Sequence, residues 1–322
     1  MRKAFLAALT AAILPSAAGA SGLFPSSPFS DGAAGTTGAA FLKLPGGARA
    51  EALAGTFAAA ADGSEAVFLN PAGLVRLAGT GRSEASVSYN ALLASSYSGA
   101  LAYARPAADG KSTFGAGFLY HSAGSIVGYD RFGNPNDSFT PTDLALSGAY
   151  ARRVGPLAVG AAAKFLRTDL AGSSGVSFAL DLGLLAERVS DIGDGALDLG
   201  ASVRNLGPAI SVGSVADPLP FVLQAGAFWH ISPQAAFLLD GHLPVDSDPF
   251  PSIGFEFTQP FGAASKGALR AGYDVRRNKS LEGLTGLAAG GGLDLDFFRI
   301  DYAWVPFGDL GTTHRLTLAF RF

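Results

Sequence analysis

Hydrophobic and polar residues alternate along most of the chain, most clearly at its C-terminal end. A period of two residues places successive side chains on opposite faces of a β-strand. The same alternation recurs upstream, for example in 298–304 and 197–204. The chain is therefore predicted to be all-β. In the last eight residues, Leu316, Leu318, Phe320 and Phe322 alternate with Arg315, Thr317, Ala319 and Arg321.

Fourteen segments follow this pattern. Most are about 9–11 residues long, the length of a tilted strand that crosses a membrane, whereas strands of soluble sheets average about 5–6 residues. An even number of strands is typical of bacterial outer-membrane barrels. We therefore predict a 14-stranded antiparallel transmembrane β-barrel over 84–322, with a soluble β-sandwich as the alternative. The predicted strands are 84–91, 97–105, 112–121, 143–151, 157–168, 175–187, 195–205, 220–230, 234–243, 251–258, 267–276, 284–296, 297–305 and 313–322.

The linkers between the predicted strands separate by length onto the two ends of the barrel. If the C-terminus is periplasmic, the long linkers 122–142 and 206–219 lie outside the cell. The tight joins at 153–156, 231–233 and 296–297 then face the periplasm. Short periplasmic turns and longer external loops are the usual arrangement in outer-membrane barrels, so we expect this orientation.

The N-terminal end has the layout of a secretory signal peptide. Two basic residues precede the apolar stretch 4–14, and Ala18-Gly19-Ala20 provides the cleavage pattern. The apolar stretch is too short to cross about 30 Å of hydrocarbon as a helix. We predict that residues 1–20 are a signal peptide and that the protein is exported to the outer membrane.

Residues 21–83 lack the alternation and are rich in alanine and glycine. Asp62-Gly63-Ser64 is predicted to cap a short helix through Phe68, which Asn70-Pro71-Ala72-Gly73 ends. A segment of about 60 residues is too small to form a comfortable core of its own. We therefore expect it to form an N-terminal plug or hatch inside the barrel; a loosely attached periplasmic extension is the alternative.

The composition fits a membrane barrel and excludes several other classes. Of the 322 residues, 15% are charged and 48% hydrophobic, and 43 are glycine. Soluble domains carry about 25% charged residues, and a net charge of −3 without a basic cluster excludes a nucleic-acid partner. The chain has no cysteine, which excludes disulfides and cysteine-ligated metals. After the first 20 positions, no uninterrupted apolar run suits a membrane helix.

The sequence contains no recognisable catalytic or metal-binding motif. The four histidines lack metal-ligand spacing, so we expect no enzymatic activity, metal or cofactor. The one charged constellation faces inward on the last strands, where acid–base pairs usually fix strands and plug through hydrogen bonds. A permeation or cargo role is the alternative. This predicted lumen charge ladder comprises Arg270, Asp274, Arg276, Asp294, Asp296, Arg299, Asp301 and Arg315.

Three blocks of sequence resemble a known family. They are 35–50 with 61–74, 203–207 with 218–220, and 301–315. In this order they resemble the PorV/PorQ family, outer-membrane barrels of the wider FadL-like class. The resemblance implies a fourteen-stranded barrel and an N-terminal hatch that carries a family motif. The motif residues in this chain are Asn70, Pro71, Ala72 and Gly73.

The resemblance also implies a function and partners. PorV-like proteins serve type IX secretion, receiving secreted client proteins and handing them to the surface attachment machinery. The expected partners are outer-membrane lipids and secreted clients or secretion machinery. The ending Phe320 and Phe322 resembles the signal read by the barrel assembly machinery. The alternative function is FadL-like transport of hydrophobic solutes.

Overall fold

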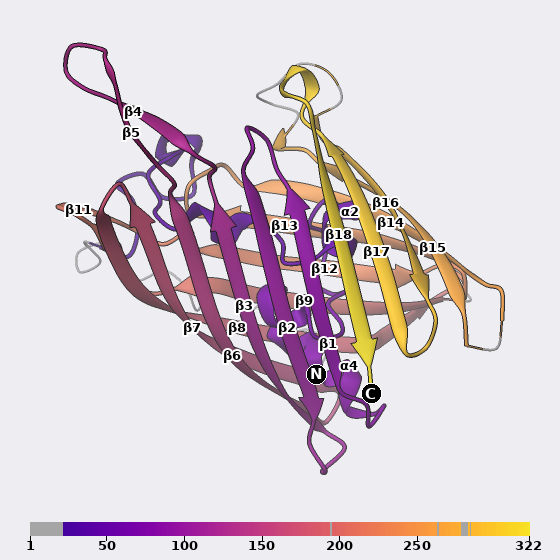
Figure 1. The fold of residues 1–322 in the computed structure, drawn as a ribbon. Coiled ribbons are helices and arrows are strands. Elements are labelled where there is room, and N and C mark those ends of the chain that lie inside the picture. The colour runs from indigo at the N-terminus through magenta and orange to yellow at the C-terminus, as the bar shows by residue number, and fades with distance from the viewer. Residues whose placement is uncertain (1–21, 194, 263, 278–282, 284) are drawn as a thin grey trace.

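The computed structural model describes residues 22–193, 195–262, 264–277, 283 and 285–322. They form a closed antiparallel barrel of fourteen strands, as predicted (Figure 1). The predicted signal peptide, 1–20, lies outside the described residues. Within the described ranges, the helices all lack the length and apolar character needed to cross a membrane.

The strands of the barrel follow the predicted segments closely, and their order around the barrel is β1-β18-β17-β16-β15-β14-β13-β12-β9-β8-β7-β6-β3-β2. The fourteen strands are β1 (Glu84–Ala91), β2 (Tyr97–Pro106), β3 (Ser112–Ser122), β6 (Thr142–Val154), β7 (Leu157–Leu170), β8 (Ser173–Ile192), β9 (Gly195–Leu206), β12 (Val222–His230), β13 (Ala235–Pro244), β14 (Phe250–Pro260), β15 (Lys266–Asp274), β16 (Leu287–Asp294), β17 (Phe298–Pro306) and β18 (Thr312–Arg321).

Most strand boundaries differ from the predicted ones by one to three residues, and three of the differences have identifiable reasons. β8 continues to Ile192, beyond the predicted end at 187, because the ladder with β9 resumes after a register shift between Ala186 and Ser190. β15 ends at Asp274 rather than 276, where the chain leaves the sheet for a loop. β16 ends at Asp294, and Asp296 turns the chain with a positive φ of 66°.

The barrel closes by pairing its first and last strands. Glu84 lies opposite Arg321, and Ala91 lies opposite His314. The end of the barrel that holds the C-terminus has short turns, such as 155–156 between β6 and β7. The long loops leave the opposite end. Because outer-membrane barrels keep short turns in the periplasm, the C-terminal end is the periplasmic one and the opposite end is extracellular.

Two long linkers on the extracellular side contain small hairpins of their own. β4 (Ile126–Tyr129) pairs with β5 (Pro135–Phe139), and β10 (Ile210–Val212) pairs with β11 (Val215–Asp217). Figure 1 shows the β4–β5 hairpin projecting well beyond the barrel wall. The alternation rule does not reveal these short strands, because β10 and β11 have only three residues each and most residues of β4 and β5 are exposed.

The two faces of the barrel differ as the alternation predicts. Large apolar side chains point outward, among them Leu101 at 52% exposed and Leu269 at 67% exposed. Small residues such as Ala102 and Ser88 point inward and are buried. Lipid offers the backbone no hydrogen bonds, so a closed barrel with an apolar outer belt is the form in which a sheet crosses a membrane. The chain is an outer-membrane β-barrel.

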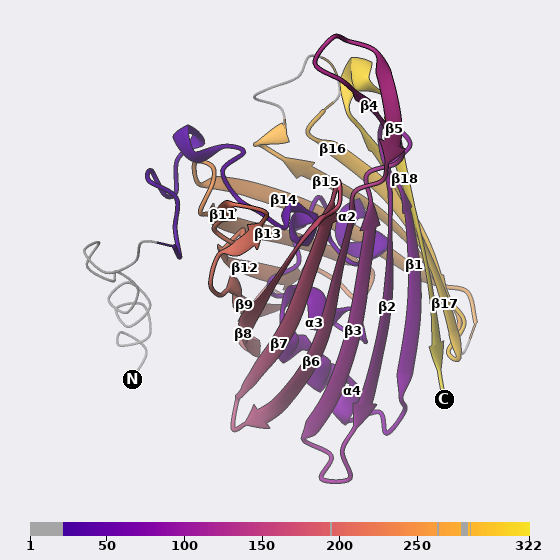
Figure 2. The same ribbon diagram turned by 60° about the vertical axis from the view of Figure 1, so that its left-hand side comes forward.

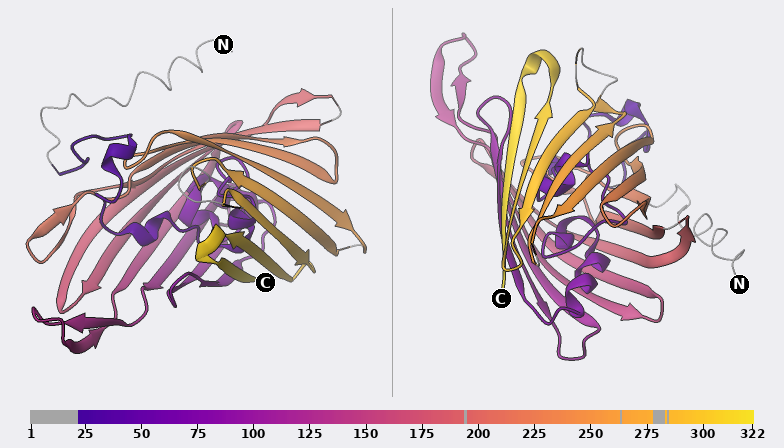
Figure 3. Two further views of the ribbon diagram at one scale, coloured as in Figure 1. Left: turned by 90° about the horizontal axis from the view of Figure 1, so that it is seen from above. Right: turned by 90° about the vertical axis from the view of Figure 1, so that its right-hand side faces the viewer.

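Residues 22–83, called the N-terminal segment from here on, begin at the rim of the barrel and then run through its inside (Figures 2 and 3). The predicted cap at 62–64 is wrong: α3 starts after Glu65, and Ser64 instead donates its N–H to Glu84 at 2.8 Å. Asn70 ends α3 and also begins η3. The short helices of this segment are η1 (Asp31–Ala33), η2 (Ala40–Lys43), α2 (Ala48–Ala52), α3 (Ala66–Leu69), η3 (Pro71–Leu74) and α4 (Val75–Ala78); η5 (Gly308–Leu310) lies between β17 and β18.

Candidate functional site

Asn70 anchors the N-terminal segment inside the barrel. Its fully buried amide Nδ2 donates to the carbonyl oxygens of Ala58 (2.7 Å) and of Leu184 in β8 (3.1 Å). Its Oδ1 accepts the N–H of Ala72 at 3.1 Å. Pro71 occupies the first position of η3, where a missing N–H costs no helical bond. The amide of Asn70 therefore ties two parts of the segment to each other and to the wall.

Glycines in three neighbouring strands make room for this anchor. A Cβ atom on Gly183 in β8 would lie 2.1 Å from the Oδ1 of Asn70. One on Gly160 in β7 would lie 2.4 Å from the carbonyl carbon of Pro71, and one on Gly200 in β9 would lie 2.2 Å from the oxygen of Ala58. Gly160 and Gly183 are cross-strand neighbours. The wall is therefore shaped to the backbone of the segment at this point.

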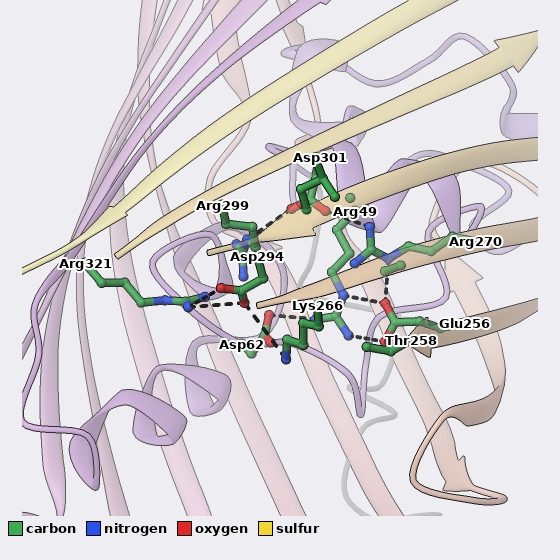
Figure 4. A pocket seen from close by; sticks show the side chains of 13 residues that line it. Arg49, Asp62, Glu256, Thr258, Lys266, Arg270, Asp294, Arg299, Asp301 and Arg321 are labelled. Carbon is green, nitrogen blue, oxygen red and sulfur yellow. Dashed lines mark hydrogen bonds and ion pairs between the residues drawn. The ribbon is translucent and has the colours of Figure 1, made fainter. Parts of the chain in front are cut away.

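A buried cluster of charges joins α2 to the opposite wall (Figure 4). The Arg49 guanidinium donates two bonds of 2.9 Å to the carboxylate of Glu256 in β14, and a third of 2.8 Å to Asp62. Arg270 in β15 donates to the same Glu256 carboxylate at 2.5 Å. Burial acts to lower the pKa of Arg49, but Asp62 and Glu256 hold it well above its ordinary value. Arg49 is thus a permanent cation within the N-terminal segment.

The cluster continues along β17 toward the periplasmic end. Arg299 lies 3.0 Å from Asp301 and 3.4 Å from Glu65 of the N-terminal segment. Asp301 also accepts a bond of 2.6 Å from Arg270. Burial raises the pKa of Glu65 to about 7, although the Arg299 charge opposes that rise. A neutral amide at this position therefore resembles one of the two protonation states of Glu65.

The predicted lumen charge ladder divides into three groups in the structure. Arg270, Arg299 and Asp301 belong to the cluster just described. Asp294 pairs with Arg321 at 2.9 Å at its periplasmic edge. Three others lie nearer the extracellular end: Arg315 is 3.1 Å from Glu51, and Asp274 is 4.0 Å from Arg276 and 3.3 Å from Arg277.

Two of the ladder residues lie outside the strands. The inward position predicted for Asp296 is wrong, because β16 ends before it. Its side chain lies in the turn, 47% exposed, and pairs with Arg82 at 2.6 Å. Arg276 follows the end of β15, and its side chain is 41% exposed. The alternation of inward and outward side chains breaks at strand ends. Whether a position is odd or even therefore does not predict the direction of its side chain there.

The sequence prediction missed six charged residues of the cluster, one of them Asp62. Glu84, Glu256 and Arg321 stand at inward positions of their strands, so the alternation could have revealed them. Arg49 and Glu65 belong to the N-terminal segment, whose sequence pattern does not predict which way a side chain points. Their roles become visible only when that segment is placed in the barrel.

The charged cluster lines a small luminal pocket of about 190 Å³ in the periplasmic half of the barrel. A second cavity of about 400 Å³ continues from it toward the periplasm, and the two share Asp62, Arg299 and Arg321. Charged walls hold water and ions well but disfavour apolar molecules, which bring no hydrogen bonds to the site. The smaller pocket, lined mainly by charged side chains, is therefore unfavourable for an apolar solute.

The outer surface of the same wall has an apolar groove of about 450 Å³. Its floor includes Gly267 in β15 and Gly291 in β16, which leave the backbone uncovered. Ala268 and Gly292 are paired across the two strands and line both the groove and the luminal pocket. A single backbone layer therefore separates the two spaces. The sides of the groove are Phe257, Leu269, Leu293, Ile300 and Tyr302.

The histidines and the two C-terminal phenylalanines have ordinary hydrogen-bonding and packing partners. His121, His230 and His242 bond to Asp143, Asp198 and Ser252 respectively. Within the described ranges there is no group of three potential metal ligands. Phe320 faces outward against Phe298 with ring centroids 4.8 Å apart, and Phe322 pairs its backbone with Ser83.

Comparison with solved structures identifies the type of barrel. The structure is similar to the Pseudomonas putida toluene transporter TodX, with a TM-score of 0.58, 14% identity and coverage of 86% of this chain and 98% of that one. The fold is that of the FadL-type outer-membrane barrels. The Ralstonia pickettii toluene transporter TbuX gives a TM-score of 0.57 at 16% identity, and a Pseudomonas aeruginosa FadL homologue gives 0.53 at 9% identity. Both alignments cover 86% of this chain and 98% of the other.

The sequence comparisons returned no relatives. No family model and no curated protein matches the chain. The structural likeness therefore supports the FadL-type fold, and nothing in these comparisons supports the PorV/PorQ family in particular.

Proposed function

We propose that the protein passes small hydrophobic solutes across the outer membrane, releasing them through its wall into the lipid. The observation that carries this proposal is the apolar groove on the lipid side of β15 and β16, which backs directly onto the lumen. The ladder of β15 and β16 is unbroken from Lys266 to Tyr273, so release into the lipid requires these two strands to part locally beside the groove.

The periplasmic end is a poor exit for such a solute. The N-terminal segment occupies the lumen, and the cavities below it are lined by Arg49, Asp62, Arg299 and other charged side chains. Moving apolar surface into such a site gains little, whereas moving it into the membrane gains about 25 cal/mol per Å² of area removed from water. The free energy of an apolar solute is therefore lower in the membrane beside the barrel than in these cavities. In this proposal residues 21–83 act as a plug that blocks direct passage to the periplasm, so the solute leaves through the wall.

The names of the structural neighbours suggest the size of the solute. TodX and TbuX are named as toluene transporters. A groove of about 450 Å³ is large enough for a single aromatic ring with short substituents. We propose monoaromatic hydrocarbons as the first compounds to test.

A direct uptake measurement tests the proposal. Cells that express the protein should take up radiolabelled toluene faster at low external concentration than matched cells that lack it. Uptake of a hydrophilic sugar of similar mass should be the same in both. Equal toluene uptake in the two strains would refute the transport function.

The role in secretion predicted from the PorV/PorQ resemblance rests on the sequence blocks alone. It predicts that loss of the protein leaves toluene uptake unchanged and retains secreted client proteins inside the cell. The uptake measurement and a comparison of the secreted proteins of the two strains therefore distinguish the two functions.

A further inference from the structure

Residues 22–47, called the strap from here on, lie along one side of the extracellular rim before the chain turns into the barrel (Figures 2 and 3). The strap is hydrogen-bonded to two extracellular loops. The N–H of Phe29 donates to the carbonyl oxygen of Val245 at 2.8 Å, and that of Gly38 donates to Pro218 at 2.9 Å. The strap then continues into α2 inside the barrel. The chain therefore reaches the outside of the cell before it turns inward to form the N-terminal segment's anchor.

One carboxylate fastens the middle of the strap. Asp246, in the loop between β13 and β14, accepts the hydroxyl of Thr37 at 2.6 Å and also pairs with the ammonium of Lys43. The Asp246 side chain is 3% exposed, whereas that of Lys43 is 34% exposed. Asp246, a buried carboxylate in a distant loop, thus binds two residues of the strap, and we call it the latch.

The strap covers apolar surface at the extracellular entrance. Phe41 and Leu42 of the strap are buried in one cluster with Ile210 and Leu219 from the loop that holds the β10–β11 hairpin. Phe24 and Phe29 pack on Phe221, with ring centroids 5.5 Å and 6.2 Å away. Lifting the strap would uncover an apolar surface that faces the outside.

The rest of the strap is weakly held. Its helices η1 and η2 are single turns, and Asp31, Gly32 and 34–36 are exposed. Segments with few buried contacts and exposed backbone open at a small fraction of the global unfolding free energy. The contacts that resist opening lie at Asp246, at the phenylalanine cluster, and between Asp31 and Asp248, whose backbone N–H groups each donate to the other's carboxylate at 3.1 Å and 3.0 Å.

We infer that this strap is the extracellular gate of the transport route and that Asp246 is its latch. When the strap lifts, a hydrophobic solute gains access to the apolar side chains that the strap covers, Ile210, Leu219 and Phe221. This inference rests on the proposed function, because a gate requires something to pass. It adds the place of entry and the residue that controls it.

A reversible lock tests the gate. The natural chain has no cysteine, so the double variant Thr37→Cys/Asp246→Cys contains only the engineered pair, whose parent side chains touch. Oxidation should lower toluene uptake by about tenfold, as expected when opening is made unfavourable by one factor of ten or more, and a reductant should restore it. Each single-cysteine variant should show no response to oxidation.

A labelling measurement tests the latch without any transport. Ala33 of the strap is 1% exposed and Ala34 beside it is exposed. In intact cells a membrane-impermeant maleimide should label Ala34→Cys quickly and Ala33→Cys slowly. Adding Asp246→Ala to Ala33→Cys should raise its labelling rate about tenfold, since bonds to a charged group are lost. Asp309→Ala, on another extracellular loop, should leave that rate unchanged.

The possible results separate the gate from the transport function. If wild-type cells take up toluene but the oxidised pair does so equally fast, the gate is wrong and the transport function stands. If Ala34→Cys is labelled only after the outer membrane is permeabilised, the strap is not extracellular and the gate is wrong. If wild-type cells show no uptake while Asp246→Ala still speeds labelling of Ala33→Cys, the strap opens as inferred and the transport function fails.

Discussion

Replacing Gly183 by alanine is expected to displace Asn70 from its hydrogen-bonded position on the barrel wall and to open the barrel to hydrophilic solutes. The new Cβ would lie 2.1 Å from Asn70 Oδ1 and 2.8 Å from the backbone nitrogen of Ala72. Both atoms belong to a buried, fully bonded turn, so they cannot move without breaking those bonds. Overpacking of this kind costs about 1–3 kcal/mol and more where backbone must shift.

Sensitivity to a large hydrophilic antibiotic reports this change. Cells with Gly183→Ala should become markedly more sensitive than wild type, and the same should hold for Gly160→Ala. Gly148→Ala is the matched control, because Gly148 faces outward on β6 with nothing within 4 Å of its Cβ position. Heat resistance of the barrel in detergent shows whether the variants still fold. A folded Gly183→Ala barrel that keeps out the antibiotic would contradict the anchor described here.

Replacing Arg49 by leucine is expected to cost about 3–5 kcal/mol, the usual penalty for removing one partner of a buried ion pair. Arg49 makes three short bonds, to Glu256 and to Asp62, that link the N-terminal segment to itself and to the wall. Its loss leaves Asp62 without its nearest cation and Glu256 with Arg270 alone. Lysine should not restore the loss, because it lacks the planar fork that meets both oxygens of Glu256.

Thermal unfolding of the purified barrel in detergent measures this cost. Arg49→Leu and Arg49→Lys should both lower the midpoint, the first by more. Glu65→Gln is the control within the same cluster: burial raises the pKa of Glu65 to about 7, so a neutral amide resembles one of its two natural states. Glu65→Gln should therefore shift the midpoint little. If Arg49→Leu is as stable as Glu65→Gln, the cluster does not hold the N-terminal segment.

The barrel could be predicted from the sequence because lipid imposes a simple rule on each strand. Residues such as Leu269 and Leu316 must be apolar while their neighbours face the lumen, and this alternation is local. The rule fails where strands end, as at Asp296, and where β8 and β9 shift register near 186–190. In both places the backbone turns or slips, so the parity of the side chains changes.

The candidate site could be predicted only in part. Arg270, Arg299 and Asp301 follow the strand parity, but their partners Arg49 and Glu65 come from a segment without a periodic pattern. The groove depends on Gly267 and Gly291 lying diagonally across the ladder on the outer face, which requires the register between β15 and β16. The run of three glycines at 290–292 indicates an uncovered backbone but not which space lies on each side. Those features are properties of pairing between distant parts of the chain.

Filling the groove tests the lateral route most directly. A leucine at Gly291 or Gly267 would project into the groove, where the nearest atoms to a new Cβ are 3.3 Å and 3.8 Å away, respectively. The measurement is toluene uptake by cells that carry Gly267→Leu/Gly291→Leu, compared with Gly148→Leu, which adds the same side chain to the lipid face of β6. The lateral route predicts that the double variant falls to the level of cells lacking the protein while Gly148→Leu keeps the wild-type rate. Equal uptake by the two variants, at equal amounts of folded barrel, would contradict it.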